Sequence, residues 1–110
     1  AADVVTSTAG AMTFDFSRSA FNEPATTENS TVSFTSLIAG QSGTLVFIQG
    51  ATGRTITMPS ASSTIKYSEA LVTLGVAAMV HTSATYITIF HYRITTGGVI
   101  LIHAREVLPS

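Results

Sequence analysis

Residues 42–59 constrain the fold of this chain more than any other segment, because two runs of β-forming residues flank a short turn there. The runs cover residues 44–49 and 54–58, and the turn between them reads Gly50-Ala51-Thr52-Gly53. Its two glycines supply the positive φ that a tight hairpin turn requires. The segment therefore predicts a β-hairpin.

The first of these runs is apolar on both of its alternating faces. Leu45 and Phe47 share one face, and Val46 and Ile48 share the other. A strand that is covered on one side only alternates between apolar and polar residues instead. We therefore expect this strand to be buried twice, once by the domain's own core and once by another body, most simply a second copy of the chain.

The composition describes one neutral, hydroxyl-rich domain. A chain of 110 residues supports a single domain, with residues 1–10 expected as an N-terminal arm or linker and residues 11–110 as a single β-sandwich domain. It has no cysteine, which excludes disulfides and thiolate metal sites, and only 10% of its residues are charged. Serine and threonine make up more than a quarter of the chain, and threonine favours strands.

Charge and hydropathy argue against two classes of partner. The net charge is −1, and the four arginines and one lysine are scattered, so no nucleic acid is expected as a partner. The longest apolar stretch, residues 70–80, is too short and too interrupted to cross a membrane. No membrane partner and no cofactor are predicted.

Alternation of apolar and polar residues marks strands along the chain. Met12, Phe14 and Phe16 alternate with polar residues, and so do Val32 and Phe34. Residues 65–67 predict a short bridge, and residues 69–80 predict a short strand plus loop, with a helical turn as the alternative. Strands at intervals of about ten residues predict an all-β fold, a small antiparallel β-sandwich that is jelly-roll-like.

The last two runs, residues 84–94 and 99–107, predict a second hairpin with Thr95 facing Val99. In this register one face is wholly apolar and carries Phe90, Tyr92 and Ile94 against Ala104, Ile102 and Ile100. The outer face carries Ile87, Ile89, His91 and Arg93 against Val107, Arg105, His103 and Leu101. A slip of one residue mixes the two faces, which favours this register.

The apolar surplus on the outer strand faces predicts an oligomer interface, because exposed apolar sheet invites aggregation. The interface candidates are Val46, Ile48, Ile87, Ile89, His91, Arg93, Leu101, His103 and Arg105. Arg93 and Arg105 either donate hydrogen bonds to a neighbouring copy or lie on an exposed flank of the hairpin.

The order of the strands resembles a family. The matching segments are Met12-Thr-Phe-Asp-Phe-Ser17, Asn29-Ser-Thr-Val-Ser-Phe34, Ala39-Gly-Gln-Ser-Gly-Thr-Leu-Val-Phe-Ile-Gln49, Ala51-Thr-Gly-Arg-Thr-Ile-Thr-Met-Pro59 and Tyr86-Ile-Thr-Ile-Phe90. They resemble a small β-domain of tailed-bacteriophage fibre and virion surface proteins, tail-fibre-like or head-fibre-like.

The resemblance implies a non-enzymatic structural protein on the surface of the virion. It implies a homotrimer that forms a fibre or a capsid or tail decoration, contacts other virion proteins and supports host attachment. The loops at residues 60–67 and 95–98 differ from the family pattern, so no binding specificity follows from it.

Two of the three histidines are candidate metal ligands. In the predicted register His91 and His103 lie opposite each other, near enough to share a metal ion. Glu106 is expected on the other face, which leaves the pair without a carboxylate, so a solvated or interfacial histidine pair is preferred. His81 is expected in a loop.

No catalytic constellation is recognisable in the sequence, and no enzyme is predicted. No serine has an argued base, and the only paired carboxylates on neighbouring predicted strands are Asp15 and Glu28, which a solvated face explains equally well. The turn from Gly50 to Gly53 joins two predicted strands rather than a strand and a helix, unlike a phosphate-binding loop.

Two rival functions remain open from the sequence. A carbohydrate-binding, lectin-like receptor-binding domain would place an exposed aromatic near Tyr67, the only tyrosine expected in a loop, on a host cell-surface glycan. A bacterial adhesin or pilin-like subunit would need a donor strand, for which residues 1–10 are too polar.

Overall fold

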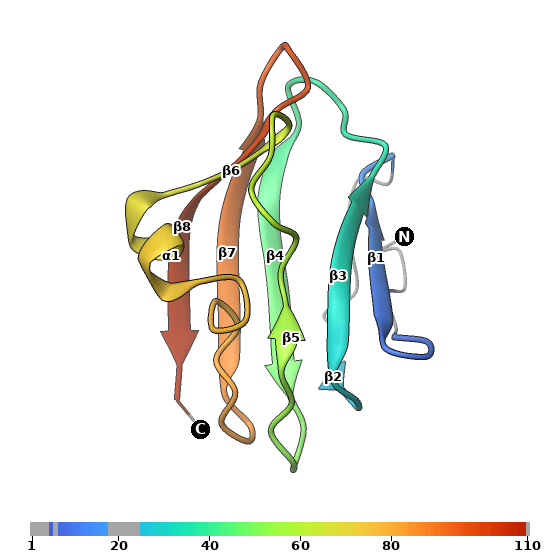
Figure 1. Cartoon of the computed structure of the whole chain (residues 1–110), viewed down its shortest axis with the longest axis vertical. Helices are drawn as coiled ribbons and strands as arrows, with labels where there is room; N and C mark the ends of the chain where they lie inside the picture. Colours follow the sequence, from blue (N-terminus) through green and yellow to red (C-terminus); the bar gives the residue numbers. More distant parts are fainter. Residues whose placement is uncertain (1–4, 6, 18–24, 110) are drawn as a thin grey trace.

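The computed structural model describes Val5, residues 7–17 and residues 25–109, which form two sheets and one short helix (Figure 1). The three-stranded sheet has the order β1-β3-β5. The five-stranded sheet has the order β2-β4-β7-β8-β6. The strands are β1 (Ala11–Asp15), β2 (Ala25–Thr26), β3 (Ser30–Thr35), β4 (Ser42–Gln49), β5 (Ile56–Thr57), β6 (Ile65–Tyr67), β7 (Ile87–Ile94) and β8 (Ile100–Leu108), and the helix is α1 (Glu69–Leu74).

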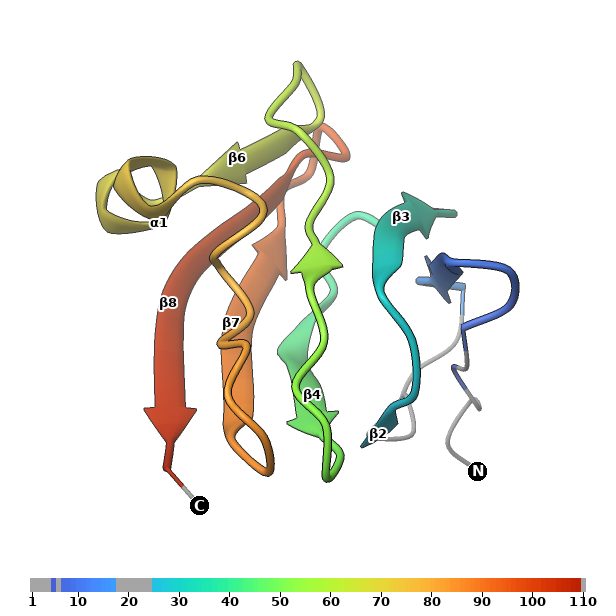
Figure 2. The same cartoon turned by 60° about the horizontal axis from the view of Figure 1, so that its bottom comes forward.

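Strands β1 to β6 alternate between the two sheets along the chain (Figure 2). Because each connection crosses to the other layer, strands two apart in sequence become neighbours and run parallel, as in β1–β3, β3–β5 and β2–β4. Of the strand pairs in the described residues, only β4–β7 and β7–β8 are antiparallel. The two-layer β domain is confirmed, whereas the expectation of an antiparallel jelly roll does not describe a parallel sheet beside a mixed one.

The hairpin predicted across residues 50–53 is wrong. Strands β4 and β5 lie in different sheets, and the intervening residues form an arch between the layers. The side chain of Gln49 holds this arch: its Nε2 donates to Arg54 O at 2.8 Å, and its Oε1 accepts from Arg54 N at 3.0 Å. The turn is therefore closed by a buried side chain instead of a backbone ladder.

Residues 69–80 also depart from the predicted strand plus loop, because α1 occupies their first half. Leu71 is buried in the core, and Gly75, with φ of +84°, ends the helix by donating from its N–H to Leu71 O at 3.1 Å. The helical alternative is thus the correct one for this half. The short bridge predicted at residues 65–67 is a three-residue strand, β6, which pairs with β8.

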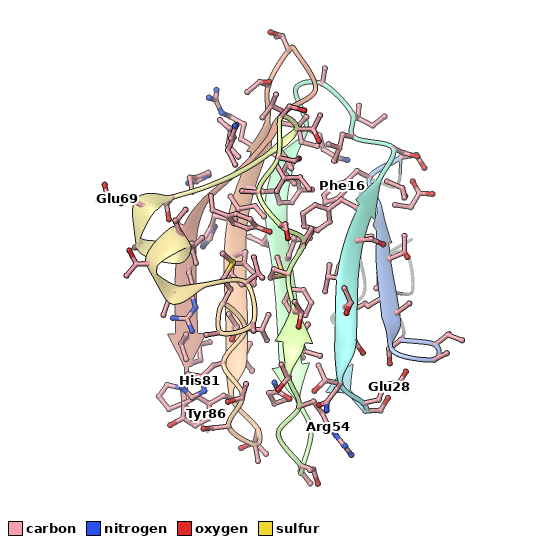
Figure 3. The ribbon with its side chains drawn as sticks, viewed as in Figure 1. Phe16, Glu28, Arg54, Glu69, His81 and Tyr86 are labelled. Atoms are coloured by element: carbon pink, nitrogen blue, oxygen red, sulfur yellow. The ribbon has the colours of Figure 1, made fainter. Side chains whose placement is uncertain are left out.

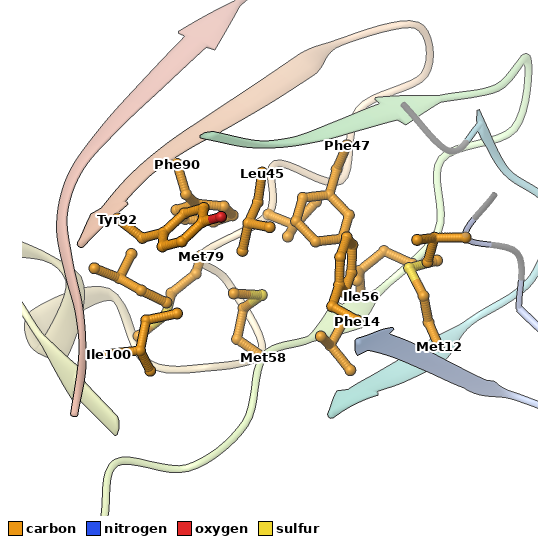
Figure 4. Packing of buried hydrophobic residues seen from close by; sticks show 14 of the residues in the cluster. Met12, Phe14, Leu45, Phe47, Ile56, Met58, Met79, Phe90, Tyr92 and Ile100 are labelled. Carbon is orange, nitrogen blue, oxygen red and sulfur yellow. The ribbon is translucent and has the colours of Figure 1, made fainter. Parts of the chain in front are cut away.

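The core lies between the two sheets, and aromatic rings in edge-to-face contact run through its aliphatic side chains (Figure 4). Phe14 of β1 and Phe47 of β4 join the sheets with ring centroids 5.5 Å apart. Phe47 continues to Phe90 at 5.8 Å, and Phe16 contacts Tyr92 at 5.2 Å. The predicted burial of Met12, Phe14 and Phe16 is confirmed, since apolar alternation marks the core-facing side of a strand.

The second predicted hairpin is confirmed at its turn, where Thr95 N donates to Val99 O at 2.9 Å. The predicted pairs Tyr92–Ile102 and Ile94–Ile100 are also present. Beyond them the predicted register is wrong by one residue, because His103 has no partner in the ladder and His91 pairs with Ala104. Such a β-bulge places two residues of one strand against one of its neighbour.

The predicted N-terminal arm is described only in part. Thr8 and Ala11 exchange backbone hydrogen bonds of 2.9 and 3.0 Å and turn the chain into β1. Residues 1–4 and 6 of the arm lie outside the described residues.

Candidate functional site: the outer face of the five-stranded sheet

The outer face of the five-stranded sheet is ordered in rows that run across β4, β7 and β8. The strand registers define these rows, because residues directly opposite each other point to the same face. From the Gln49 end of β4 upward, the rows are Ile48–Ile87–Leu108, Val46–Ile89–Glu106, Thr44–His91–Ala104 and Ser42–Arg93–Leu101. The face is therefore apolar at one end and polar at the other.

The apolar end of this face has no partner within the described chain. The three-stranded sheet packs against the opposite face (Figures 1 and 2). Val46, Ile48, Ile87 and Ile89 are half-buried by their neighbours in the sheet, and Leu108 is 46% exposed. The apolar rows thus form a continuous strip of side chains at the surface.

Eight of the nine predicted interface residues share this surface, and Arg105 does not. The bulge at His103 turns Arg105 to the core side, opposite Phe90, where its Nε donates to Met79 O at 2.6 Å. Burial lowers the pKa of its guanidinium from the ordinary value. The prediction of Arg105 on the outer face is wrong because it assumed an unbroken ladder.

The same bulge brings two residues to the outer face that sequence reasoning missed. Glu106 and Leu108 take the positions that Arg105 and Val107 occupy in the predicted register. The expectation that Glu106 lies on the other face is wrong, since its Oε1 lies 2.5 Å from His91 Nε2. Nothing in the local sequence distinguishes His103 as an extra residue, so no pattern would have found them.

The histidine cluster does not assemble a metal site in the described part of the chain. The rings of His91 and His103 have centroids 6.5 Å apart, and Glu106 pairs with His91. No group of three or more His, Cys, Asp or Glu residues among those described is arranged to hold a metal ion. The cluster is instead a polar group at the border of the apolar rows.

Tyr67, the candidate for glycan stacking, lies in β6 with its ring packed against the core. Its hydroxyl donates to Pro59 O at 2.5 Å, and burial raises its pKa well above the usual range. The geometry therefore does not offer Tyr67 as an exposed platform.

A stacked pair of rings lies instead at the end of the sheet where residues 50–55 cross between the layers. His81, in the predicted loop, and Tyr86 are stacked with centroids 4.3 Å apart and planes 15° apart (Figure 3). Their loop is fixed by Gln49, whose Nε2 donates to His81 O at 2.8 Å, and by Thr85 N, which donates to Gly50 O at 3.0 Å. The pair is half-buried, and sequence reasoning did not single it out.

The carboxylates Asp15 and Glu28 do not converge. β1 and β3 are parallel with Ala11 opposite Thr31, so Asp15 ends β1 at one end of the pair and Glu28 precedes β3 at the other. Asp15 Oδ1 accepts from Ser17 N at 3.0 Å and from Ser17 Oγ at 2.7 Å. The arrangement does not resemble the facing carboxylates of a glycosidase.

Comparisons with known proteins add no relative, because no family model, no curated protein and no solved structure matches the chain. In the part of the chain that the structure describes, no helix is long and apolar enough to cross a membrane. A functional assignment therefore rests on the fold and on the outer face of the five-stranded sheet.

Proposed function

We propose that this chain is a non-enzymatic structural domain of a bacteriophage virion. In this proposal it forms a homotrimeric fibre or a capsid or tail decoration on the particle surface, contacts other virion proteins and supports host adsorption. The order of its sequence segments supports the viral assignment. The observation that carries the proposal of an assembly is the strip of apolar residues on the outer face of the five-stranded sheet, four of them partly buried and Leu108 46% exposed.

The energetics favour association of such a face. Burying ~500 Å² of apolar surface per copy at ~25 cal/mol/Å² would contribute on the order of 10 kcal/mol per copy, before the cost of association. The remaining surface is suited to a particle exterior, since 10% charged residues and a net charge of −1 leave it neutral and rich in hydroxyl groups.

The solution mass tests this proposal. Multi-angle light scattering should give about three times 11.5 kDa, the mass of one chain. A monomer that persists at the highest concentration reached would contradict the assembly, and with it the physical support for a fibre or decoration domain.

Carbohydrate binding stays the second candidate, and the stacked pair of His81 and Tyr86 is the observation that favours it. Aromatic rings on a fixed loop stack on sugar rings, and Ser83 and Thr82 add exposed hydroxyl groups beside the pair. A glycan array probed with the wild-type chain and with Tyr86→Ala separates the two functions. Binding that Tyr86→Ala abolishes would favour the lectin, and no binding would leave the structural domain.

A further inference from the structure

We infer that a second copy of this chain docks on the apolar rows of the outer face, with the charged groups at their border setting how the copies are aligned. This inference rests on the proposed homotrimer and names its interface. The contact surface is formed by Val46, Ile48, Ile87, Ile89 and Leu108, with Glu106 and Arg93 placed to pair between copies.

The apolar rows suit the face of another β-sheet. Ile48, Ile87 and Leu108 lie in register across three strands, and Val46 and Ile89 form the next row. Side chains in two such rows stand at the spacing of the pleat, so three equivalent faces that converge on a threefold axis pack their rows against one another. Further copies of the chain provide those faces without any further assumption about a partner.

The charged residues of the outer face are complementary to those on the same face of another copy. Arg93 is exposed and has no ion pair with a described residue, and Glu106, which contacts His91 in its own copy but keeps 56% of its side chain exposed, carries the opposite charge two rows away. Around a threefold axis each copy meets its neighbours through different parts of the same surface, so Arg93 of one copy can meet Glu106 of the next. A strongly acidic or basic partner would leave one of the two charges facing its like.

The edges of the five-stranded sheet argue against the other way in which sheets associate. The edge strands β2 and β6 have two and three residues, and β6 covers β8 only from Ile100 to Ile102. The rest of β8 carries devices that disfavour pairing of edges: the bulge at His103, the inward-pointing Arg105, and Pro109 directly after the strand. The edge formed by β8 is thus protected, while the apolar face is left open.

The central experiment introduces a charged side chain into the apolar rows of the outer face. Ile89→Glu should dissociate the trimer and weaken association by about 100-fold or more, because the new carboxylate would be desolvated without a partner. Leu108→Asp is the second variant, at the end of β8, where a change is least able to prevent folding. Ile38→Asp is the matched control: Ile38 is 47% exposed, lies on the loop before β4 and is not part of the face.

The readout is the mass from light scattering, with far-ultraviolet circular dichroism to establish that each variant is folded. We expect folded monomers of 11.5 kDa for Leu108→Asp and Ile89→Glu and an unchanged trimer for Ile38→Asp. A wild-type monomer would overturn the proposed function itself. A wild-type trimer that survives in folded Leu108→Asp would overturn only the interface inferred here.

Charge reversal tests the alignment of the copies independently of the apolar rows. Arg93→Glu and Glu106→Arg should each weaken association, and the double variant should restore most of it, because the pair is re-formed with its signs exchanged. Additive loss in the double variant would overturn the pairing.

Discussion

His91 Nε2 lies 2.5 Å from Glu106 Oε1, although the two residues are not opposite each other in the β7–β8 ladder. Glu106 pairs with Ile89, and His91 pairs with Ala104, so the contact is diagonal across the sheet. It depends on the extra residue His103, which shifts the rest of β8 by one position. A single bulge thus decides which charged side chains the outer face displays.

Deletion of His103 should leave the chain folded. The residues after it already occupy their faces by virtue of the bulge, so a regular strand without His103 would keep Ala104 opposite His91 and Arg105 opposite Phe90. The midpoint of thermal unfolding should change by no more than about 5 °C, corresponding to about 1 kcal/mol. His103→Ala, which keeps the bulge, is the control. A deletion variant that is unfolded while His103→Ala is folded would contradict the prediction.

Gly53→Ala should be strongly destabilising. A Cβ at this position would lie 1.8 Å from Thr82 O, so the arch of residues 50–55 and the loop before β7 would have to separate. We expect a loss of at least about 2 kcal/mol in the free energy of unfolding, measured with urea. Gly97→Ala is the matched control, because its nearest neighbour would be Thr95 Oγ1 at 3.8 Å, and its effect should stay within about 0.5 kcal/mol.

Gln49→Leu should lower the free energy of unfolding by more than the loss of its own hydrogen bonds suggests. Gln49 is 2% exposed, and its amide contacts Thr26 Oγ1, Arg54 and His81 O. Without it, several buried polar groups lose their partner, so the expected loss is about 3 kcal/mol or more. Thr26→Val removes only one of these contacts and should cost about 1 kcal/mol in the same urea titration; equal effects of the two changes would contradict this account.

Alkaline pH should destabilise the fold through Tyr67. Burial raises the pKa of its phenol above the value in the unfolded chain, so the folded state holds the proton more tightly. This contribution to stability is complete below the unfolded pKa of about 10 and is lost progressively as the pH rises above it. Urea unfolding at about pH 8 and about pH 10.5 should reveal the decline.

Tyr67→Phe is the test of that assignment. The variant loses the hydrogen bond to Pro59 O, which should cost about 1 kcal/mol at neutral pH. The free energy of unfolding of the variant should also fall less steeply than that of the wild type as the pH becomes alkaline. Because burial also raises the pKa of Tyr92, a part of the decline should remain in the variant. An unchanged slope would assign the effect to other groups.

Features that depend on local alternation were predictable from the sequence. Met12, Phe14 and Phe16 face the core, because a strand sends successive side chains to opposite faces. For the same reason Leu45 and Phe47 lie on the core face of β4, and Val46 and Ile48 lie on its outer face. The turn at Thr95 was predictable for the same reason, since its flanking runs have matching apolar faces.

Features that depend on distant contacts were not predictable. Whether residues 50–53 close a hairpin or an arch is decided by Gln49, whose partners include His81 and Thr26 far along the chain. The face of Arg105 is set by the bulge at His103, and there its guanidinium donates to Met79 O, a contact distant in sequence. The helix at residues 69–74 is favoured by burial of Leu71, which outweighs the weak helix propensity of Val72 and Thr73.

The alternation of β1 to β6 between two layers has a consequence for how fast this chain can fold. None of these strands pairs with its immediate successor, so a nascent chain that ends before β7 has no local hairpin with which to begin. The β7–β8 unit, closed by a short turn, is the only pairing of consecutive strands among the described elements and the natural nucleus. Refolding should accordingly be slow, on the order of milliseconds to seconds, and should wait for the C-terminal residues to be present.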